Sequence, residues 1–176
     1  MRLDFVGVAS IATVLIVSGL ARASTKSPSC IIPTTLERKI ASNYPGERLV
    51  ALSDLGDEQK KYFKLEHPSA CPGIVRLDFY GDGKPTFALA LASTTATKLV
   101  IAHYSKEEWS LELLEKTDGA PSYPIIWRQG PGKYTDVYGE KTIRARHPVI
   151  VFCGYESWAI LYSWTGTTVS KIWLAD

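Results

Sequence analysis

The spacing of hydrophobic residues changes near residue 74. From there to the end of the chain, apolar and polar residues mostly alternate in short runs, which is the period of half-buried β-strands. Turn-forming residues separate the runs, and the last three runs, at 149–152, 157–164 and 169–174, are joined by very short connections. The pattern therefore predicts about eight strands, the last of which form an antiparallel meander.

Before this alternating region the apolar residues have helical spacing. Leu36 and Ile40 lie four residues apart in the segment 35–41, and the segment 58–66 carries apolar residues on a charged background. The expected fold class is α+β: a curved, mainly antiparallel β-sheet of about eight strands with two N-terminal helices packed on it. One domain is expected to span residues 35–176.

One of the predicted strands is apolar on both faces. In the segment 158–164, the residues Trp158, Ile160 and Tyr162 fall on one face, and Leu161 falls on the other. Such a strand needs cover from both sides. The two N-terminal helices are the expected cover.

The first residues have the layout of a secretory signal peptide. An unbroken apolar or small run covers residues 5–20, and the small residues Ala21 and Ala23 follow it. We expect residues 1–23 to be a signal peptide and residues 24–34 to be a flexible arm. An uncleaved N-terminal anchor is the alternative. Cleavage predicts a secreted or periplasmic protein with no stable membrane span.

The charge balance predicts which class of partner the protein does not bind, namely nucleic acid. The chain has 20 Lys and Arg residues against 18 Asp and Glu residues, a formal net charge of +2 at pH 7. Without Arg2, Arg22 and Asp4 of the predicted signal peptide, 18 basic and 17 acidic side chains remain. The basic residues are also scattered along the sequence. This balance predicts that nucleic acid is not a partner.

The cysteines predict one disulfide. The chain has Cys30, Cys71 and Cys153, and export to an oxidising compartment favours the pairing of two of them. The sequence allows all three pairings. We favour Cys71–Cys153, because both residues adjoin predicted core strands whereas Cys30 lies in the polar arm.

The segment 78–86 has the spacing of a calcium-binding loop. Asp78, Asp82 and the carbonyl of Lys84 take the first, fifth and seventh ligand positions, with a glycine at the sixth. Two other ligand positions carry a phenol and a neutral hydroxyl, so the prediction is weak calcium binding. The alternative is a β-hairpin turn, in which Asp and Gly serve the backbone geometry alone.

The same loop, followed by the apolar segment 87–91, resembles the Asp-x-Asp-x-Asp-Gly loops of FG-GAP and VCBS-type repeats. With Cys-Pro-Gly at 71–73, Gly-Tyr-Glu-Ser at 154–157 and Tyr-Ser-Trp-Thr-Gly at 162–166, the chain is similar to a family of exported bacterial proteins of uncharacterised function. The resemblance covers most of residues 45–176. It implies a type of fold rather than an activity.

Glu156 is the acid that the sequence singles out. It lies among Tyr155, Trp158, Tyr162 and Trp164, and an acid surrounded by aromatic side chains can have a raised pKa. Aromatic faces also bind sugars. The alternative is a hairpin corner stabilised by cross-strand aromatic pairs.

Together these features predict an exported, non-enzymatic binding or interaction module. The partner is expected to be an unknown protein or a cell-envelope glycan, and calcium is the only candidate cofactor. The three histidines, His67, His103 and His147, lack the spacing of metal ligands and are expected to be structural. The alternative function is a small cell-envelope hydrolase or lyase that acts on a carbohydrate through Glu156 and an unidentified second acid.

Overall fold

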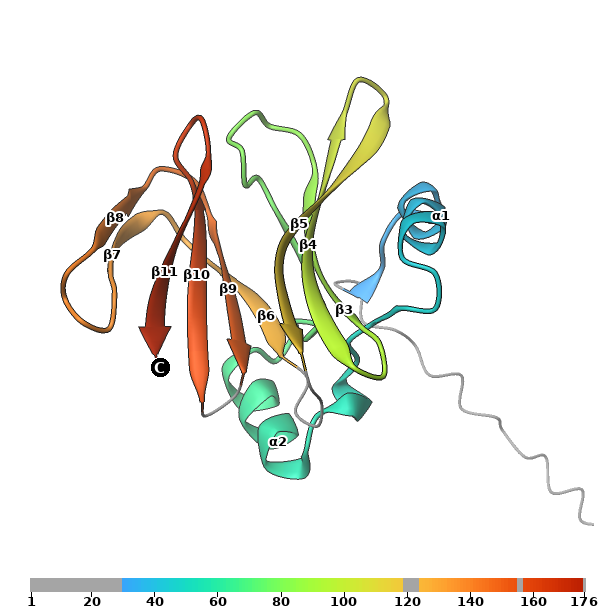
Figure 1. Cartoon of the computed structure of the whole chain (residues 1–176), viewed down its shortest axis with the longest axis horizontal. Coiled ribbons are helices and arrows are strands. Elements are labelled where there is room, and N and C mark those ends of the chain that lie inside the picture. The colour runs from blue at the N-terminus through green and yellow to red at the C-terminus, as the bar shows by residue number, and fades with distance from the viewer. Residues whose placement is uncertain (1–29, 119–123, 155–156, 176) are drawn as a thin grey trace, which may run out of the picture.

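The computed structural model describes residues 30–118, 124–154 and 157–175 (Figure 1). The predicted signal peptide and the first part of the predicted arm lie outside the described residues. The rest of the arm is packed rather than loose, because Ile32 is buried and a helix begins at Thr34. No helix in the described ranges has the length and hydrophobicity needed to cross a membrane.

Two α-helices, one short 3-10 helix and eleven strands make up the described part of the chain, as an α+β fold. The helices are α1 (Thr34–Asn43), the short 3-10 helix η2 (Leu52–Asp54) and α2 (Asp57–Glu66). The strands are β1 (Arg48–Leu49), β2 (Ile74–Leu77), β3 (Thr86–Ala92), β4 (Ala96–Ser105), β5 (Glu108–Asp118), β6 (Ile125–Gln129), β7 (Gly132–Thr135), β8 (Thr142–Ala145), β9 (Val149–Gly154), β10 (Trp158–Trp164) and β11 (Val169–Ala175).

The strands form three sheets, all of them antiparallel, rather than the single curved sheet that was predicted. The first sheet has the order β1–β3–β4–β5, with β2 also paired to β3 next to β1. The second sheet has the order β11–β10–β9–β6, and β7 pairs with β8 in a separate hairpin. The predicted meander at the end of the chain is confirmed as β9–β10–β11.

The two larger sheets pack face to face, and the main hydrophobic core lies between them. Ala90 and Ile101 of the first sheet share this core with Phe152, Ile160 and Tyr162 of the second. All of these side chains are at most 2% exposed. The alternation along β10 is therefore as predicted, with Ile160 and Tyr162 turned toward the first sheet.

The cover of β10 differs from the prediction. On its other face, Leu161 packs with Val151 of β9 and with Ile143 and Ala145 of the β7–β8 hairpin. The first sheet and this hairpin cover β10, so the expectation that the helices do so was wrong. Apolar residues on both faces of a strand indicate that both faces are buried, but they do not show which element buries each face.

Each helix covers a different part of the molecule (Figure 1). Leu36 and Ile40 of α1 lie on the outer face of the first sheet, where they pack with Leu89 and Trp109. In contrast, Phe63 of α2 packs with Ile125 of β6, at one end of the second sheet. The apolar face of α1 is thus buried as its spacing predicted, whereas α2 buries Phe63 and leaves Tyr62 and Leu65 44% and 75% exposed.

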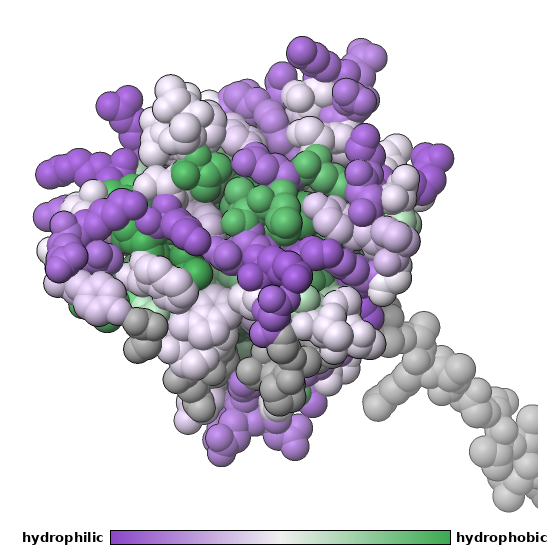
Figure 2. Space-filling model, in the orientation of Figure 1, coloured by the Kyte–Doolittle hydropathy of each residue, from purple (hydrophilic) through white to green (hydrophobic). Residues whose placement is uncertain are grey.

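The two long sides of the sandwich are unlike each other. On one side β2 approaches β6, and the Ile126 N–H donates to the Pro72 carbonyl across 2.8 Å. On the other side β5 faces β10 and β11, and the contact is made by polar side chains: Glu115 accepts hydrogen bonds from Tyr162 and Lys171. Hydrophobic residues remain visible between hydrophilic ones on the face shown in Figure 2.

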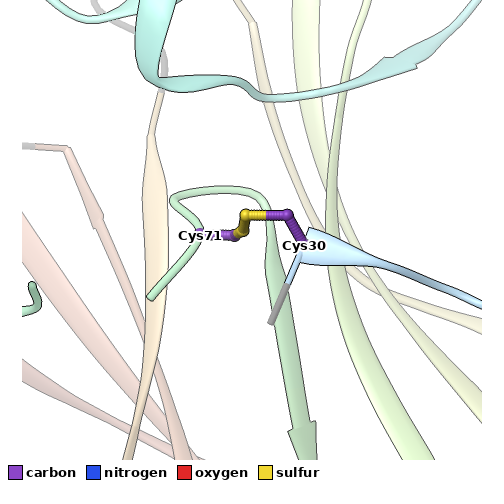
Figure 3. Close-up of a disulfide and its surroundings, with 2 residues drawn as sticks. All are labelled: Cys30 and Cys71. Carbon is purple, nitrogen blue, oxygen red and sulfur yellow. A yellow bond between two sulfur atoms is a disulfide. The ribbon is translucent and has the colours of Figure 1, made fainter. Parts of the chain in front are cut away.

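The disulfide joins Cys30 to Cys71, so the predicted pair Cys71–Cys153 was wrong (Figure 3). The Cα atoms of Cys30 and Cys71 are 5.4 Å apart, within the normal range for a disulfide. The hydrophobic packing of Ile32 beside Cys71 brings Cys30 to its partner. Cys153 is a free thiol on β9, where it packs near α2.

We predict that Cys71→Ser lowers stability by about 4 kcal/mol, because the disulfide closes a loop with a sequence separation of 41 residues. In a domain of this size the melting temperature should fall by roughly 10 °C. Thermal melts of the variant and of Cys153→Ser, the matched control, measure the effect. A non-reducing peptide map that links Cys71 to Cys153 would contradict the pairing.

Candidate functional site

The loop predicted to bind calcium joins β2 to β3 and turns at two glycines. Gly81 and Gly83 have φ angles of +71° and +73°, a backbone region that favours glycine. Gly81 also lies directly under the ring of His147, where an added Cβ atom would be only 2.0 Å from a ring carbon. The glycine pattern of the loop is therefore required by backbone geometry and by close packing.

The two aspartates of this loop accept hydrogen bonds from the protein itself. Asp78 Oδ2 accepts from the Gly83 N–H at 3.3 Å, and Asp82 Oδ1 accepts from the Lys84 N–H at 3.0 Å. Asp82 Oδ2 lies 3.0 Å from His103 Nε2. Burial alone would raise the pKa of Asp82, but the bond from Lys84 and the neighbouring His103 outweigh it and lower that pKa.

Asp78 keeps one buried oxygen, Oδ1, which has no hydrogen-bond partner among the described residues. Three or more His, Cys, Asp or Glu side chains do not come together as a metal-binding group anywhere in the described ranges. Calcium binding by Asp78, Asp82 and the Lys84 carbonyl therefore stays a prediction. It requires Asp82 to turn away from His103.

Tyr80, at the third ligand position of the loop, points into the sandwich. Its hydroxyl donates to Glu112 Oε2 across 3.3 Å, and its ring packs against those of His103 and Trp164, with centroids 4.5 and 5.0 Å away. Burial raises the pKa of Tyr80 well above its usual range. Tyr80 thus anchors the loop to β5 and β10.

The two tryptophans of β10 lie at opposite ends of the strand. Trp164 belongs to the cluster around Tyr80, whereas Trp158 lies at the other end beside Trp173 of β11, with ring centroids 6.4 Å apart. Trp158 is held against Phe152, and its indole lies so close to Gly154 that a Cβ atom there would come within 2.4 Å of it. Trp158 is therefore fixed, while Trp173 is 39% exposed.

These two tryptophans border a cavity of about 290 Å³ between β5 and the β10–β11 hairpin, which we call the tryptophan cleft. Its lining residues are Glu115, Lys116, Thr117, Trp158, Ile160, Lys171 and Trp173. Two aromatic rings, one acid and two lysines thus border one small space. Strands rather than loops supply all of these side chains.

Glu115 is the central polar group of the tryptophan cleft. Its Oε2 accepts from the Tyr162 hydroxyl and from Lys171 Nζ, each at 2.8 Å. Burial would raise the pKa of Glu115, but the bonds from Lys171 and Tyr162 outweigh it, so the pKa lies below its ordinary value. Glu115 is therefore a carboxylate at neutral pH, fixed in position by two donors.

The sequence did not indicate Glu115 or Lys171. They lie 56 positions apart in the chain, and each looks like an ordinary solvent-facing residue of an amphipathic strand. Glu156 and Tyr155, which the sequence singled out, lie outside the described residues. Of the aromatic cluster proposed around Glu156, the structure places Trp158 in the cleft.

His67 and the free thiol of Cys153 lie in packed surroundings. The ring of His67 stacks on Trp127, with centroids 5.2 Å apart, and burial lowers the pKa of His67. Burial, together with Glu66, raises the pKa of the Cys153 thiol to about 11. The thiol is therefore protonated at neutral pH and is a poor nucleophile.

A wider cavity of about 700 Å³ lies between α2 and the disulfide. Most of its lining is apolar, including Leu52, Phe63 and Ile74, and Lys64 and His67 are its only ionisable groups. Binding sites usually combine apolar walls with several polar groups that converge on the ligand. The tryptophan cleft fits that description better.

We predict that His103→Ala strengthens any binding of calcium by the 78–86 loop, because it releases Asp82 Oδ2. Calcium at ten times its dissociation constant would add about 1.4 kcal/mol, or a few degrees in melting temperature. Melts in EDTA, millimolar calcium and magnesium measure this for the variant and for the natural protein. The added substitution Asp78→Asn should abolish the shift. Identical melts of both proteins in EDTA and calcium would identify the loop as a turn alone.

We also predict that Glu115 contributes to stability above pH 5 and loses this contribution in acid. Its folded-state pKa is lowered, so the contribution is present above the unfolded value of about 4.3 and disappears as the pH falls through the folded value. The free energy of unfolding, measured in urea between pH 7 and pH 3, should fall less in Glu115→Gln than in the natural protein. Glu58→Gln on α2 is the control. Equal pH dependence in all three proteins would contradict the prediction.

Comparison with known proteins finds no matching family model, no matching curated protein and no matching solved structure.

Proposed function

We propose that the protein is an exported, non-enzymatic binding module that binds a cell-envelope glycan at the tryptophan cleft. The observation that carries the proposal is the convergence of Trp158 and Trp173 with Glu115 and Lys171 on one small cavity. Sugars present apolar C–H faces and hydroxyl groups side by side. A site with aromatic faces next to fixed polar groups complements both.

The two polar side chains have complementary roles in this proposal. Glu115 is an ionised acceptor for sugar hydroxyl groups, and Lys171 is a donor that also holds Glu115 in place at 2.8 Å. Hydrogen bonds to charged groups are stronger than neutral ones. The cavity, at about 290 Å³, lies at the lower end of the range for ligand sites. That volume suits a single sugar residue, with the rest of the glycan lying along the surface.

Binding is favoured over hydrolysis by the ionisation of Glu115 in the cleft. A glycosidase needs one carboxyl with a raised pKa that can donate a proton. Glu115, the acid that lines the cleft, has the opposite shift. The alternative hydrolase or lyase would depend on Glu156.

Export is supported by the disulfide between Cys30 and Cys71. Disulfides persist mainly in oxidising compartments such as the periplasm or the cell exterior. A secreted or periplasmic protein would meet glycans of the cell envelope. The compartment and the proposed ligand class are therefore consistent.

The test is the replacement of Trp173 by Ala, which removes the exposed ring without opening the core. We predict at least a roughly tenfold loss of affinity for the glycan, about 1.4 kcal/mol. Co-sedimentation with insoluble peptidoglycan, chitin and cellulose identifies the class of glycan, and calorimetry with soluble fragments measures the dissociation constant. Tyr62→Ala, which removes an exposed ring from α2, is the control.

Two results would count against the proposal. Equal affinity of Trp173→Ala and Tyr62→Ala would remove the tryptophan cleft from the binding site. Release of shortened glycan fragments by the natural protein, lost in Glu156→Gln, would favour the enzymatic alternative.

A further inference from the structure

Three basic side chains surround one cleft on the side of the sandwich away from the tryptophan cleft. Arg76 comes from β2, Arg128 from β6 and Lys84 from the loop before β3, and together they line a cavity of about 450 Å³. We call this cavity the basic cleft. The three residues are far apart in sequence and come together because β2 lies beside β6.

These cations are not neutralised by ion pairs. Elsewhere Arg48 pairs with Asp54, Lys98 with Glu47 and Lys171 with Glu115. None of the ion pairs in the described part of the chain involves Arg76, Arg128 or Lys84.

One acid, Asp78, does line the basic cleft. Its carboxylate is turned into the protein, since Oδ2 accepts from the Gly83 N–H and Oδ1 is buried. Asp82, next to Lys84, is directed toward His103. The cleft therefore presents three cations and one inward-facing carboxylate, a charge balance that attracts anions.

A second cavity of about 430 Å³ adjoins the basic cleft. Arg76 and Arg128 line both cavities, so the two spaces share these arginines as a common border. The second cavity is walled by Pro68 and by the stacked rings of His67 and Trp127. The cavity bordered by the three cations thus lies beside one with aromatic and apolar walls.

We infer that these joined cavities bind an organic phosphate, with the phosphate group on Arg76, Arg128 and Lys84 and its apolar part against His67 and Trp127. Guanidinium groups present paired N–H donors in a fork that matches phosphate oxygens. Lysine adds a compact charge. The apolar compartment distinguishes an organic phosphate from the free inorganic ion.

This site is separate from the glycan site of the proposed function. The tryptophan cleft lies between β5 and the β10–β11 hairpin, whereas the phosphate site lies where β2 meets β6. Loss of glycan binding would therefore leave phosphate binding unchanged. The phosphate group has two sources, a soluble metabolite or a lipid headgroup, and both offer the same chemistry to the two arginines.

Calorimetry with phenyl phosphate and with inorganic phosphate tests the inference on the whole exported chain. We expect phenyl phosphate to bind more tightly, because its ring enters the compartment beside Trp127. Arg76→Gln and Arg128→Gln should each weaken binding at least about tenfold, the loss of one strong charge-assisted contact. Both side chains are exposed, so neither substitution disturbs the core. The matched control is Arg144→Gln, which makes the same charge change on β8.

Two further arms complete the test. Co-sedimentation with phosphatidylglycerol vesicles is compared with co-sedimentation with phosphatidylcholine vesicles. Binding to phosphatidylglycerol that Arg128→Gln abolishes identifies a lipid headgroup as the source of the phosphate. Binding of phenyl phosphate without binding of vesicles identifies a soluble source. Equal weakening by Arg144→Gln would overturn the inference. So would an equal heat signal from sodium chloride at matched ionic strength.

Discussion

The face-to-face packing of the two large sheets is the contact on which the rest of the structure depends. β3 contributes small side chains to it, Ala88, Ala90 and Ala92, and the second sheet contributes the large rings of Phe152 and Tyr162. Small residues opposite large ones allow the layers to interlock at the density of a protein interior. Because this contact fixes the separation of the sheets, it also fixes which polar side chains can meet at their edges.

Both candidate sites are products of that geometry. At one edge Glu115 of the first sheet reaches Lys171 of the second, and at the other edge Arg76 and Arg128 line the same cavity from different sheets. Each site therefore needs both sheets to be complete. Residues carried by strands are also held more firmly than residues on loops, which suits sites that must be ready before a ligand arrives.

The sequence predicted local structure well and long-range assembly poorly. The alternation over residues 158–164 assigned Ile160 and Leu161 to opposite faces of β10 correctly. The same alternation could not show that a hairpin covers Leu161, because periodicity reports that a face is buried and carries no information about its partner. The Cys30–Cys71 pairing depended on the packing of Ile32, which seemed part of a polar arm. Nothing in the sequence around Glu115 or around Lys171 indicated that these two side chains form an ion pair.

β1 and β2 lie end to end along the same edge of β3, with residues 50–73 between them. The chain leaves this edge just after the Val50 N–H donates to the Ala90 carbonyl, and returns where the Ala90 N–H donates to the Gly73 carbonyl. A long, continuous edge would offer a row of free backbone groups to a strand from another molecule. Here the edge is broken by an excursion that carries α2, and its second half is shielded by β6. The interruption thus protects a β-rich protein against edge-to-edge aggregation.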